Sequence, residues 1–295
     1  MNNVIVVGSG VMGSGITQLL SMNNIKTIIT DISVENLKRS KEKILLNLDS
    51  LQKKSIITED QKVNSLKNVD FVEKLNLKKY NAELVIEAAS ENYNLKKEIF
   101  KEIEKKVSLN CILATNTSSI SINKIASELK FPERFIGMHF FNPATIMKLV
   151  EIVKGDKTSA ETTNKISKLA KRLDKVGVVS KDSPGFVSNR ILMPMINEAI
   201  ETLRQNVAGV NEIDSVMRLG MAHPMGPLKL ADFIGLDVCK SILEVLSEGF
   251  DDKKYDPSPL LIKMVNEGKL GRKTMEGFYN YNQNPRNPSV AYKNP

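Results

Sequence analysis

Apolar and polar residues follow one another along the first thirty positions in the order of a strand, a helix and a second strand. Residues 4–7 are continuously apolar over a length that suits a strand buried on both faces. Residues 16–24 carry apolar positions at helical spacing, and residues 26–30 form another short apolar run. This order predicts a βαβ unit with two parallel strands.

The alternation of strands and helices continues to about residue 184. Residues 33–54 and 58–69 are charged segments with apolar positions at helical intervals, and Thr58 and Gln61 have the spacing of a capping box, so we expect a helical hairpin. Further strands are expected at 83–90, 111–116, 134–141 and 148–155, and further helices at 94–107, 121–129 and 159–176. The pattern predicts an α/β fold with a Rossmann-like, doubly wound, mostly parallel sheet.

The pattern changes after Pro184 and Gly185, where helical periodicity replaces the alternation. Segments with this periodicity, separated by turns rich in proline and glycine, are 187–206, 211–220, 228–250 and 258–270. We therefore expect two domains: residues 1–184 form the sheet domain with its hairpin insertion, and residues 185–295 form an all-helical, all-α domain.

A glycine-rich turn follows the first predicted strand and opens the first predicted helix. In its G-x-G-x-x-G spacing, the first glycine permits a tight turn, the second allows a pyrophosphate to approach, and the third lets the helix pack on the strand. The diphosphate then lies at the helix N-terminus. An aspartate at the end of the second strand is placed to bind a ribose diol and to repel the extra phosphate of NADP. We expect NAD, with NADP disfavoured, in contact with Gly8, Gly10, Val11, Met12, Gly13 and Asp31.

Composition narrows the class of protein. The chain has 295 residues, 41% hydrophobic and 26% charged, which is ordinary for a globular protein with two cores. Its two cysteines, Cys111 and Cys239, lack metal-ligand or redox spacing, so we expect reduced packing residues and no metal. The chain opens directly with a strand-like run, and no stretch approaches the ~18 apolar residues of a membrane span. A cytoplasmic protein without a membrane partner is expected.

The formal charge of +8 has two possible meanings. A nucleic-acid binder concentrates its basic residues and interleaves them with aromatic ones. Here the lysines are spread over amphipathic helices with acids between them, and tryptophan is absent, so no nucleic-acid partner is expected. A positive field of this kind still favours polyanionic small molecules such as nucleotides and coenzyme A.

Two groups of polar residues follow strands of the predicted sheet. Ligands bind outside the carboxyl ends of such strands. Asn116 and Ser118 lie at one such end, where an amide and hydroxyls suit a nicotinamide and a polar substrate group, although Ser119 and Ser121 also suit a helix N-cap.

His139 and Glu151 each lie within an apolar strand. A carboxylate in such a run is costly unless it is paired, and His139 is its natural partner if the two strands lie side by side. Glu151 would then accept a hydrogen bond from one imidazole nitrogen and leave the other as a base. That base would take the proton of a substrate hydroxyl while hydride leaves the same carbon.

With these residues assembled, the chain resembles the 3-hydroxyacyl-CoA dehydrogenase family, in its stand-alone bacterial 3-hydroxybutyryl-CoA form. The resemblance covers essentially the full length. The motifs that carry it are "GSGVMGSGI", "VIEAASEN", "TNTSS", "GMHFFNP", "KLVE", "DSPGFVSNR", "NEA", "HPMGPLKLADFIGLD" and "GRKT…GFYNY".

The resemblance implies an NAD-binding domain followed by a helical domain that forms a homodimer, with acyl-CoA thioesters as substrates. It implies that (S)-3-hydroxyacyl-CoA and 3-ketoacyl-CoA are interconverted, with His139 as the base, Glu151 as its orienting carboxylate and Ser118 near the substrate hydroxyl. It also implies that Asn189 polarises the developing carbonyl. Further cofactor contacts implied by the resemblance are Glu91, Lys96, Asn142 and Lys273.

Three positions depart from the family pattern. Met275 stands where glycine is usual, which would strain the chain if that site needs a positive φ and would affect the contact from Lys273. Asn206 replaces a turn glycine, a milder change because asparagine tolerates left-handed geometry. Thr145 replaces a proline and loosens the loop between His139 and Glu151.

Two other functions stay open at this point. One is an NAD-dependent dehydrogenase of a free β-hydroxyacid, a class that typically uses a lysine base. The other is a non-catalytic dinucleotide-binding protein, which would have no need for a buried acid–base pair.

Overall fold

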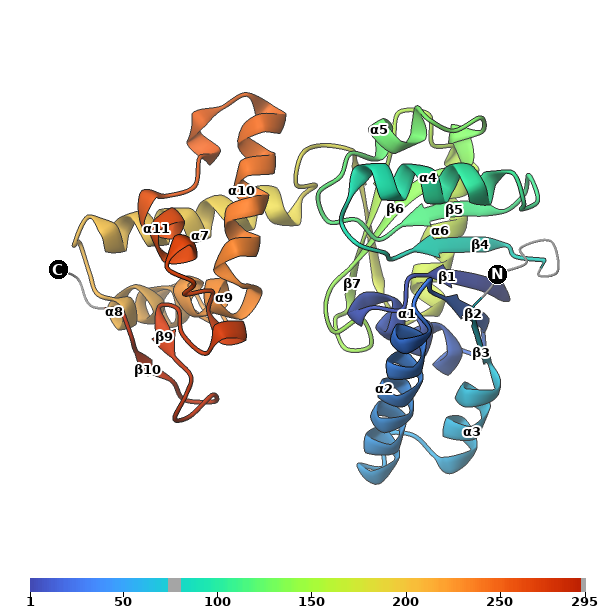
Figure 1. The fold of residues 1–295 in the computed structure, drawn as a ribbon, viewed down its shortest axis with the longest axis horizontal. Coiled ribbons are helices and arrows are strands. Elements are labelled where there is room, and N and C mark those ends of the chain that lie inside the picture. Colours follow the sequence, from blue (N-terminus) through green and yellow to red (C-terminus); the bar gives the residue numbers. More distant parts are fainter. Residues whose placement is uncertain (74–80, 293–295) are drawn as a thin grey trace. The chain divides into compact units, whose positions relative to one another are not determined.

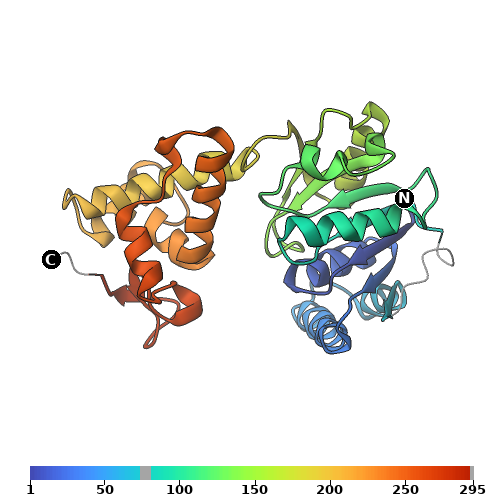
Figure 2. The same ribbon diagram turned by 45° about the horizontal axis from the view of Figure 1, so that its top comes forward.

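The chain folds into two compact units, Met1–Ser183 and Pro184–Pro295. The computed structural model describes residues 1–73 and 81–292. In that part of the chain, no helix is long and apolar enough to cross a bilayer. Figures 1 and 2 show the two units.

The first unit is built on an eight-stranded sheet with strand order β3-β2-β1-β4-β5-β6-β7-β8. Neighbouring strands are parallel except for β6 and β7, which are antiparallel. The strands are β1 (Asn3–Val7), β2 (Lys26–Thr30), β3 (Val69–Val72), β4 (Leu84–Glu87), β5 (Ile112–Thr115), β6 (Phe135–Phe140), β7 (Leu149–Lys154) and β8 (Val176–Lys181). The predicted Rossmann-like, mostly parallel sheet is confirmed.

Helices cover both faces of this sheet. They are α1 (Val11–Met22), α2 (Val34–Lys53), α3 (Glu59–Lys67), α4 (Tyr93–Glu104), α5 (Ile122–Ala126) and α6 (Ala160–Arg172), with a short 3-10 turn at Pro132–Arg134. Ile16 of α1 and Ile166 of α6 pack in one cluster with Ile136 of β6. The preceding residue of β6, Phe135, points the other way because side chains alternate along a strand, and it meets Phe100 of α4 with ring centroids 4.8 Å apart. In both views α4 lies across this second face (Figure 1, Figure 2).

The predicted helical hairpin is present as α2 and α3. Thr58 caps α3 by accepting a hydrogen bond from the Gln61 amide, and the Gln61 side chain accepts one from the Thr58 amide, which completes the expected capping box. Two strands were not predicted. The prediction placed Val69, the first residue of β3, at the end of the second hairpin helix, and it assigned no strand to β8, an edge strand whose Val176, Val178 and Val179 are exposed.

The second unit is helical, as predicted. Its helices are α7 (Ser188–Arg204), α8 (Val210–Ser215), the π-helical turn η3 (Val216–Gly220), α9 (Pro227–Ile234), α10 (Leu236–Phe250) and α11 (Pro259–Asn266), with 3-10 turns at Lys253–Tyr255 and Arg272–Thr274. A single helix had been expected over 228–250, but Gly235, with φ of 107°, separates α9 from α10. The unit also contains two very short antiparallel strands, β9 (Tyr279–Asn280) and β10 (Ser289–Val290).

Two buried aspartates attach the C-terminal segment to the helices of this unit. Asp232 accepts hydrogen bonds from the amides of Phe278 and Tyr279, at 3.0 and 2.9 Å, and from the Tyr281 hydroxyl. Asp214 accepts a 2.7 Å hydrogen bond from the Tyr279 hydroxyl. Burial raises the pKa of Asp232 to about 6 and also raises the pKa of Asp214.

Positions 206 and 275, where the family pattern has glycine and this chain has Asn206 and Met275, both have left-handed backbone geometry. Met275 has φ of 62° and Asn206 has φ of 58°. The strain anticipated at Met275 is therefore present, whereas asparagine at 206 adopts this geometry at a lower cost.

Candidate active site

The glycine turn after β1, residues 8–13, lets α1 pack closely on the strand and leaves space for a ligand to approach the backbone. Gly8 has φ of 100°, and a Cβ there would lie 2.7 Å from the carbonyl carbon of Ala88. A Cβ on Gly13 would lie 1.9 Å from the Gly8 carbonyl oxygen, so α1 can pack on the strand only without a side chain. A Cβ on Gly10 would meet nothing within 4 Å. The open space at Gly10, at the uncapped start of α1, fits a diphosphate held by backbone amides.

Asp31 follows β2 beside this turn. Its carboxylate accepts hydrogen bonds from the Ser9 amide at 2.7 Å and the Ser9 hydroxyl at 2.9 Å, and a third from the Ser33 amide. Partial burial acts to raise the pKa of Asp31, but these hydrogen bonds outweigh it and hold the pKa below its usual value. The carboxylate is therefore ionised at neutral pH. Ser9 had not been predicted, because a serine in a glycine-rich turn carries no distinctive sequence signal.

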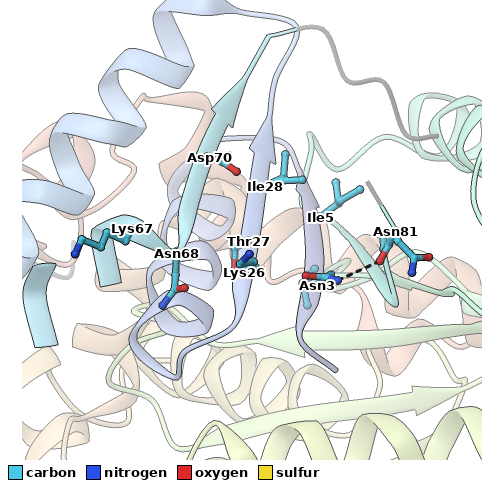
Figure 3. A pocket seen from close by; sticks show the side chains of 11 residues that line it. Asn3, Ile5, Lys26, Thr27, Ile28, Lys67, Asn68, Asp70 and Asn81 are labelled. Carbon is cyan, nitrogen blue, oxygen red and sulfur yellow. Dashed lines mark hydrogen bonds between the residues drawn. The ribbon is translucent and has the colours of Figure 1, made fainter. Parts of the chain in front are cut away.

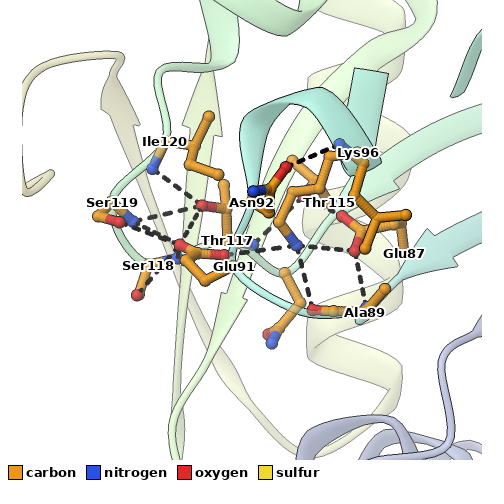
Figure 4. Close-up of polar contacts among 12 residues, drawn as sticks. Glu87, Ala89, Glu91, Asn92, Lys96, Thr115, Thr117, Ser118, Ser119 and Ile120 are labelled. Carbon is orange, nitrogen blue, oxygen red and sulfur yellow. Dashed lines mark hydrogen bonds and ion pairs between the residues drawn. The ribbon is translucent and has the colours of Figure 1, made fainter. Parts of the chain in front are cut away.

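Lys96 lies in a buried ion pair between the end of β4 and the first turn of α4 (Figure 4). Its ammonium is 2.7 Å from a Glu87 oxygen and 3.4 Å from a Glu91 oxygen, and Lys96 is only 1% exposed. Lys96 and Glu91, both predicted as cofactor contacts, are thus brought together. Glu87 had not been predicted, since a single acid at a strand end looks like any polar boundary residue.

Glu91 organises the hydroxyl-rich turn that follows β5 (Figure 4). One of its oxygens accepts hydrogen bonds from the Thr117 hydroxyl at 2.5 Å and from the Ser118 and Ser119 amides at 2.9 and 3.1 Å. Burial acts to raise the pKa of Glu91, but Lys96 and these donors lower it. Glu91 is therefore an anion that fixes the position of Ser118, the predicted substrate contact.

Asn116, directly after β5, connects the ends of the two strands that flank it, β4 and β6. The backbone amide of Asn116 donates a hydrogen bond to the Glu87 backbone carbonyl at 2.8 Å, and the side-chain oxygen of Asn116 accepts one from the Phe140 backbone amide at 2.9 Å. Phe140 follows His139 directly in β6. Asn116 thus fixes the end of the strand that carries His139.

His139 and Glu151 are register partners on the antiparallel strands β6 and β7. The Glu151 carboxylate accepts a hydrogen bond from His139 Nδ1 at 2.8 Å, and the two residues are 8% and 2% exposed. The Phe141 ring packs against the imidazole with centroids 4.6 Å apart. A buried imidazole with one nitrogen held by a carboxylate can present the other nitrogen as a base.

Three further predicted residues lie just beyond β6 or in the second unit. Asn142 is an exposed residue just beyond β6. Asn189, 8% exposed, belongs to the second unit, where its amide donates to the Gly185 carbonyl at the start of α7. Lys273 also belongs to the second unit and forms an ion pair with Asp237. The roles of all three stay predictions.

A separate hollow of about 320 Å³ lies at the opposite edge of the sheet (Figure 3). Its lining includes Asn3, Lys26 and Asp70, from the amino-terminal parts of β1 and β2 and from β3. Ligands of doubly wound sheets bind outside the carboxyl ends of the strands, where the glycine turn, Asp31 and the Glu91 turn are found. This hollow contains none of the predicted site residues.

The fold and the glycine turn together define a dinucleotide-binding protein with a helical second unit. Residues 3–183 match the family described as "3-hydroxyacyl-CoA dehydrogenase, NAD binding domain", and residues 185–281 match "3-hydroxyacyl-CoA dehydrogenase, C-terminal domain". The chain belongs to the 3-hydroxyacyl-CoA dehydrogenase family.

Individual relatives and solved structures agree with this assignment. The chain is 45% identical to the 3-hydroxybutyryl-CoA dehydrogenase of Bradyrhizobium diazoefficiens, over 94% of each chain. It is 47% identical to the probable 3-hydroxybutyryl-CoA dehydrogenase of Deinococcus radiodurans, over 94% of this chain and 99% of the relative. The crystal structure of (S)-3-hydroxybutyryl-CoA dehydrogenase PaaH1 from Ralstonia eutropha superimposes with a TM-score of 0.93 at 45% identity, covering 96% of this chain and all of that one.

Proposed function

We propose that this protein is an oxidoreductase that interconverts (S)-3-hydroxyacyl-CoA, with 3-hydroxybutanoyl-CoA as the preferred substrate, and 3-ketoacyl-CoA. The observation that carries the proposal is the buried His139–Glu151 pair, with 2.8 Å between Nδ1 and Oε2, in the unit that also carries the dinucleotide turn. A scaffold that only bound a dinucleotide would have no use for a buried acid–base pair, which is costly to bury. The names of the relatives at 45% and 47% identity support the same substrate class.

In this mechanism His139 moves the proton. NAD, when bound, supplies the acceptor for the hydride that leaves the hydroxyl-bearing carbon. The Nε2 nitrogen of the His139 imidazole takes the hydroxyl proton, and Glu151 stabilises the imidazolium that forms and holds the ring in one orientation. In the reverse direction the imidazolium returns the proton to the carbonyl oxygen.

Two polar residues complete the proposed machinery. Ser118, whose amide is fixed by Glu91, is assigned to the substrate oxygen, and Asn189 is assigned to the developing carbonyl. A hydrogen-bond donor aimed at an oxygen whose charge changes during reaction stabilises the transition state more than the ground state.

The preference for NAD over NADP is assigned to Asp31. Its lowered pKa keeps a negative charge beside the glycine turn at neutral pH. Such a charge binds a ribose diol and repels the 2′-phosphate of NADP. Cofactor contacts are further assigned to Glu91, Lys96, Asn116, Asn142 and Lys273.

The second unit is assigned to the substrate cleft and to homodimer formation. Large apolar residues that are more than 60% exposed occur along it, and they include Ile191, Val207, Val216, Leu219 and Met221. Three of them, Val216, Leu219 and Met221, lie within six residues at and just after η3, and a local cluster of exposed apolar residues favours a protein–protein interface. Light scattering of the purified protein should give the mass of a dimer, twice 32.9 kDa.

One spectrophotometric assay tests the function directly. NADH oxidation is followed with acetoacetyl-CoA, and parallel reactions contain NADPH, or free acetoacetate in place of the thioester. We expect turnover with NADH and acetoacetyl-CoA, and much slower reactions in both parallels. Faster turnover of the free acid would favour a β-hydroxyacid dehydrogenase, and cofactor binding without turnover would favour a non-catalytic protein.

A further inference from the structure

Glu87 is a fully buried carboxylate that the proposed mechanism does not use. It is the last residue of β4 and is 0% exposed. One of its oxygens accepts hydrogen bonds from the Lys96 ammonium and the Ala89 amide, both at 2.7 Å, and the other accepts from the Thr115 hydroxyl at 2.7 Å (Figure 4). The three partners offset the cost of burying this charge, and two of them, the Ala89 amide and the Thr115 hydroxyl, are independent of Lys96.

On one side, Glu87 supports the glycine turn. Its register partner in β1 is Val7, and the Ala88 amide donates to the Val7 carbonyl at 2.7 Å. The Ala88–Ala89 peptide lies against Gly8, where a Cβ would come within 2.7–2.8 Å of it. Glu87 holds the Ala89 amide and therefore fixes the surface on which the glycine turn rests.

On the other side, Glu87 acts through Lys96 on the turn that carries Ser118. Lys96 is 1% exposed and bridges Glu87 and Glu91. Glu91 in turn holds the hydroxyl of Thr117 and the amide of Ser118. The chain of contacts thus extends from the pyrophosphate side of the cofactor site to the side assigned to the nicotinamide.

The charges of this network do not balance. Two carboxylates, Glu87 and Glu91, share one ammonium, so the group carries a formal charge of −1. The nicotinamide ring of NAD⁺ is positively charged and that of NADH is neutral. A fixed negative charge at this edge therefore stabilises bound NAD⁺ more than bound NADH.

We propose that Glu87 is a positioning residue of the cofactor site and that its carboxylate sets the relative affinity for oxidised and reduced cofactor. This inference rests on the proposed function, because it requires the nicotinamide to bind beside the turn at Thr117–Ser119. It assigns Glu87 no contact with the cofactor or the substrate.

The test compares cofactor affinities of Glu87→Gln, Lys96→Gln and wild type. NADH binding is followed by the fluorescence of the dihydronicotinamide, with no tryptophan in the chain to interfere, and NAD⁺ binding by calorimetry. Glu87→Gln brings the formal charge of the network to zero, so the ratio Kd(NAD⁺)/Kd(NADH) should rise about five- to tenfold, the lower part of the range for coupling between two sites that do not touch. Lys96→Gln brings the charge to −2, so the same ratio should fall.

Opposite shifts separate this role from simple loosening of the site. A purely structural role would weaken NAD⁺ and NADH binding together in both variants and leave the ratio unchanged, which would overturn the proposal. Glu98→Gln, which removes a carboxylate whose side chain is 66% exposed on the same helix, should leave the ratio at its wild-type value. If Glu87→Gln does not fold, Glu87→Gln is introduced together with Lys96→Gln and compared with Lys96→Gln; loss of the Glu87 charge should again raise the ratio, and an equal ratio in these two variants would overturn the proposal.

The two proposals can fail separately. Wild-type protein that binds neither cofactor form, or that does not turn over acetoacetyl-CoA, would refute the proposed function. Wild-type protein that is active, together with an unchanged affinity ratio in the folded variants, would refute only the role of Glu87.

Discussion

Replacing Glu151 by glutamine removes the charge that supports the proposed base while preserving the size of the side chain. In the structure the carboxylate lies 2.8 Å from His139 Nδ1 and is 2% exposed. Glutamine can still accept or donate a hydrogen bond there, so the imidazole should stay near its position. The variant therefore isolates the electrostatic part of the interaction.

The size of the effect follows from this geometry. With the two charges roughly 4 Å apart and an effective dielectric constant of about 20, the carboxylate stabilises a full imidazolium by about 4 kcal/mol. A transition state with half of the proton transferred would receive about 2 kcal/mol. The turnover number should therefore fall about 30- to 1000-fold. The Michaelis constant for NADH should change little, since Glu151 is assigned no cofactor contact.

The assay is steady-state oxidation of NADH by acetoacetyl-CoA with wild type, Glu151→Gln and a matched control. Glu161→Gln removes one carboxylate whose side chain is 75% exposed on α6 of the same unit, and it should behave as wild type. Circular dichroism and NADH titration verify that the variants fold and bind cofactor. A turnover number of Glu151→Gln within a factor of three of wild type would refute the reasoning and would favour a different base.

Two further predictions concern the stability of the second unit. Ala222 is exposed with φ of 56°, so Ala222→Gly should raise the free energy of unfolding by about 1 kcal/mol through relief of left-handed strain, and a loss of stability in denaturant titration would contradict this. The folded pKa of Asp232, about 6 against the usual 3.8, means that the unfolded chain loses this proton first as the pH rises. As the pH rises from about 4 to about 6, ionisation of Asp232 should therefore lower the free energy of unfolding by about 3 kcal/mol. The Asp232→Asn variant should not show this decline. Equal pH dependence of thermal unfolding in wild type and Asp232→Asn would be inconsistent with it.

The order of strands and helices could be predicted wherever a segment is buried in a regular way. β1, β4 and β5 are short apolar runs because both of their faces are covered, and the capping box at Thr58 predicts the start of α3. β8 could not be predicted in this way. It is an edge strand with exposed valines, and its apolar run over 176–179 is short and begins at the residue where the preceding helical segment was predicted to end.

The contact between His139 and Glu151 could be anticipated because a lone acid in an apolar strand needs a partner. Its catalytic role stays a prediction. Glu87 and Ser9 could not be found from the sequence, because their importance depends on which strand ends and turns lie side by side. The break at Gly235 could not be predicted for another reason: a glycine within a helical pattern is often tolerated without ending the helix.

The central claim is that His139 is the base of an NAD-dependent 3-hydroxyacyl-CoA dehydrogenase. Its most direct test measures NADH oxidation by acetoacetyl-CoA with His139→Gln, alongside NADH binding by the same protein. We predict that turnover is abolished while NADH binds as tightly as in wild type. Near-normal turnover in this variant would contradict the account.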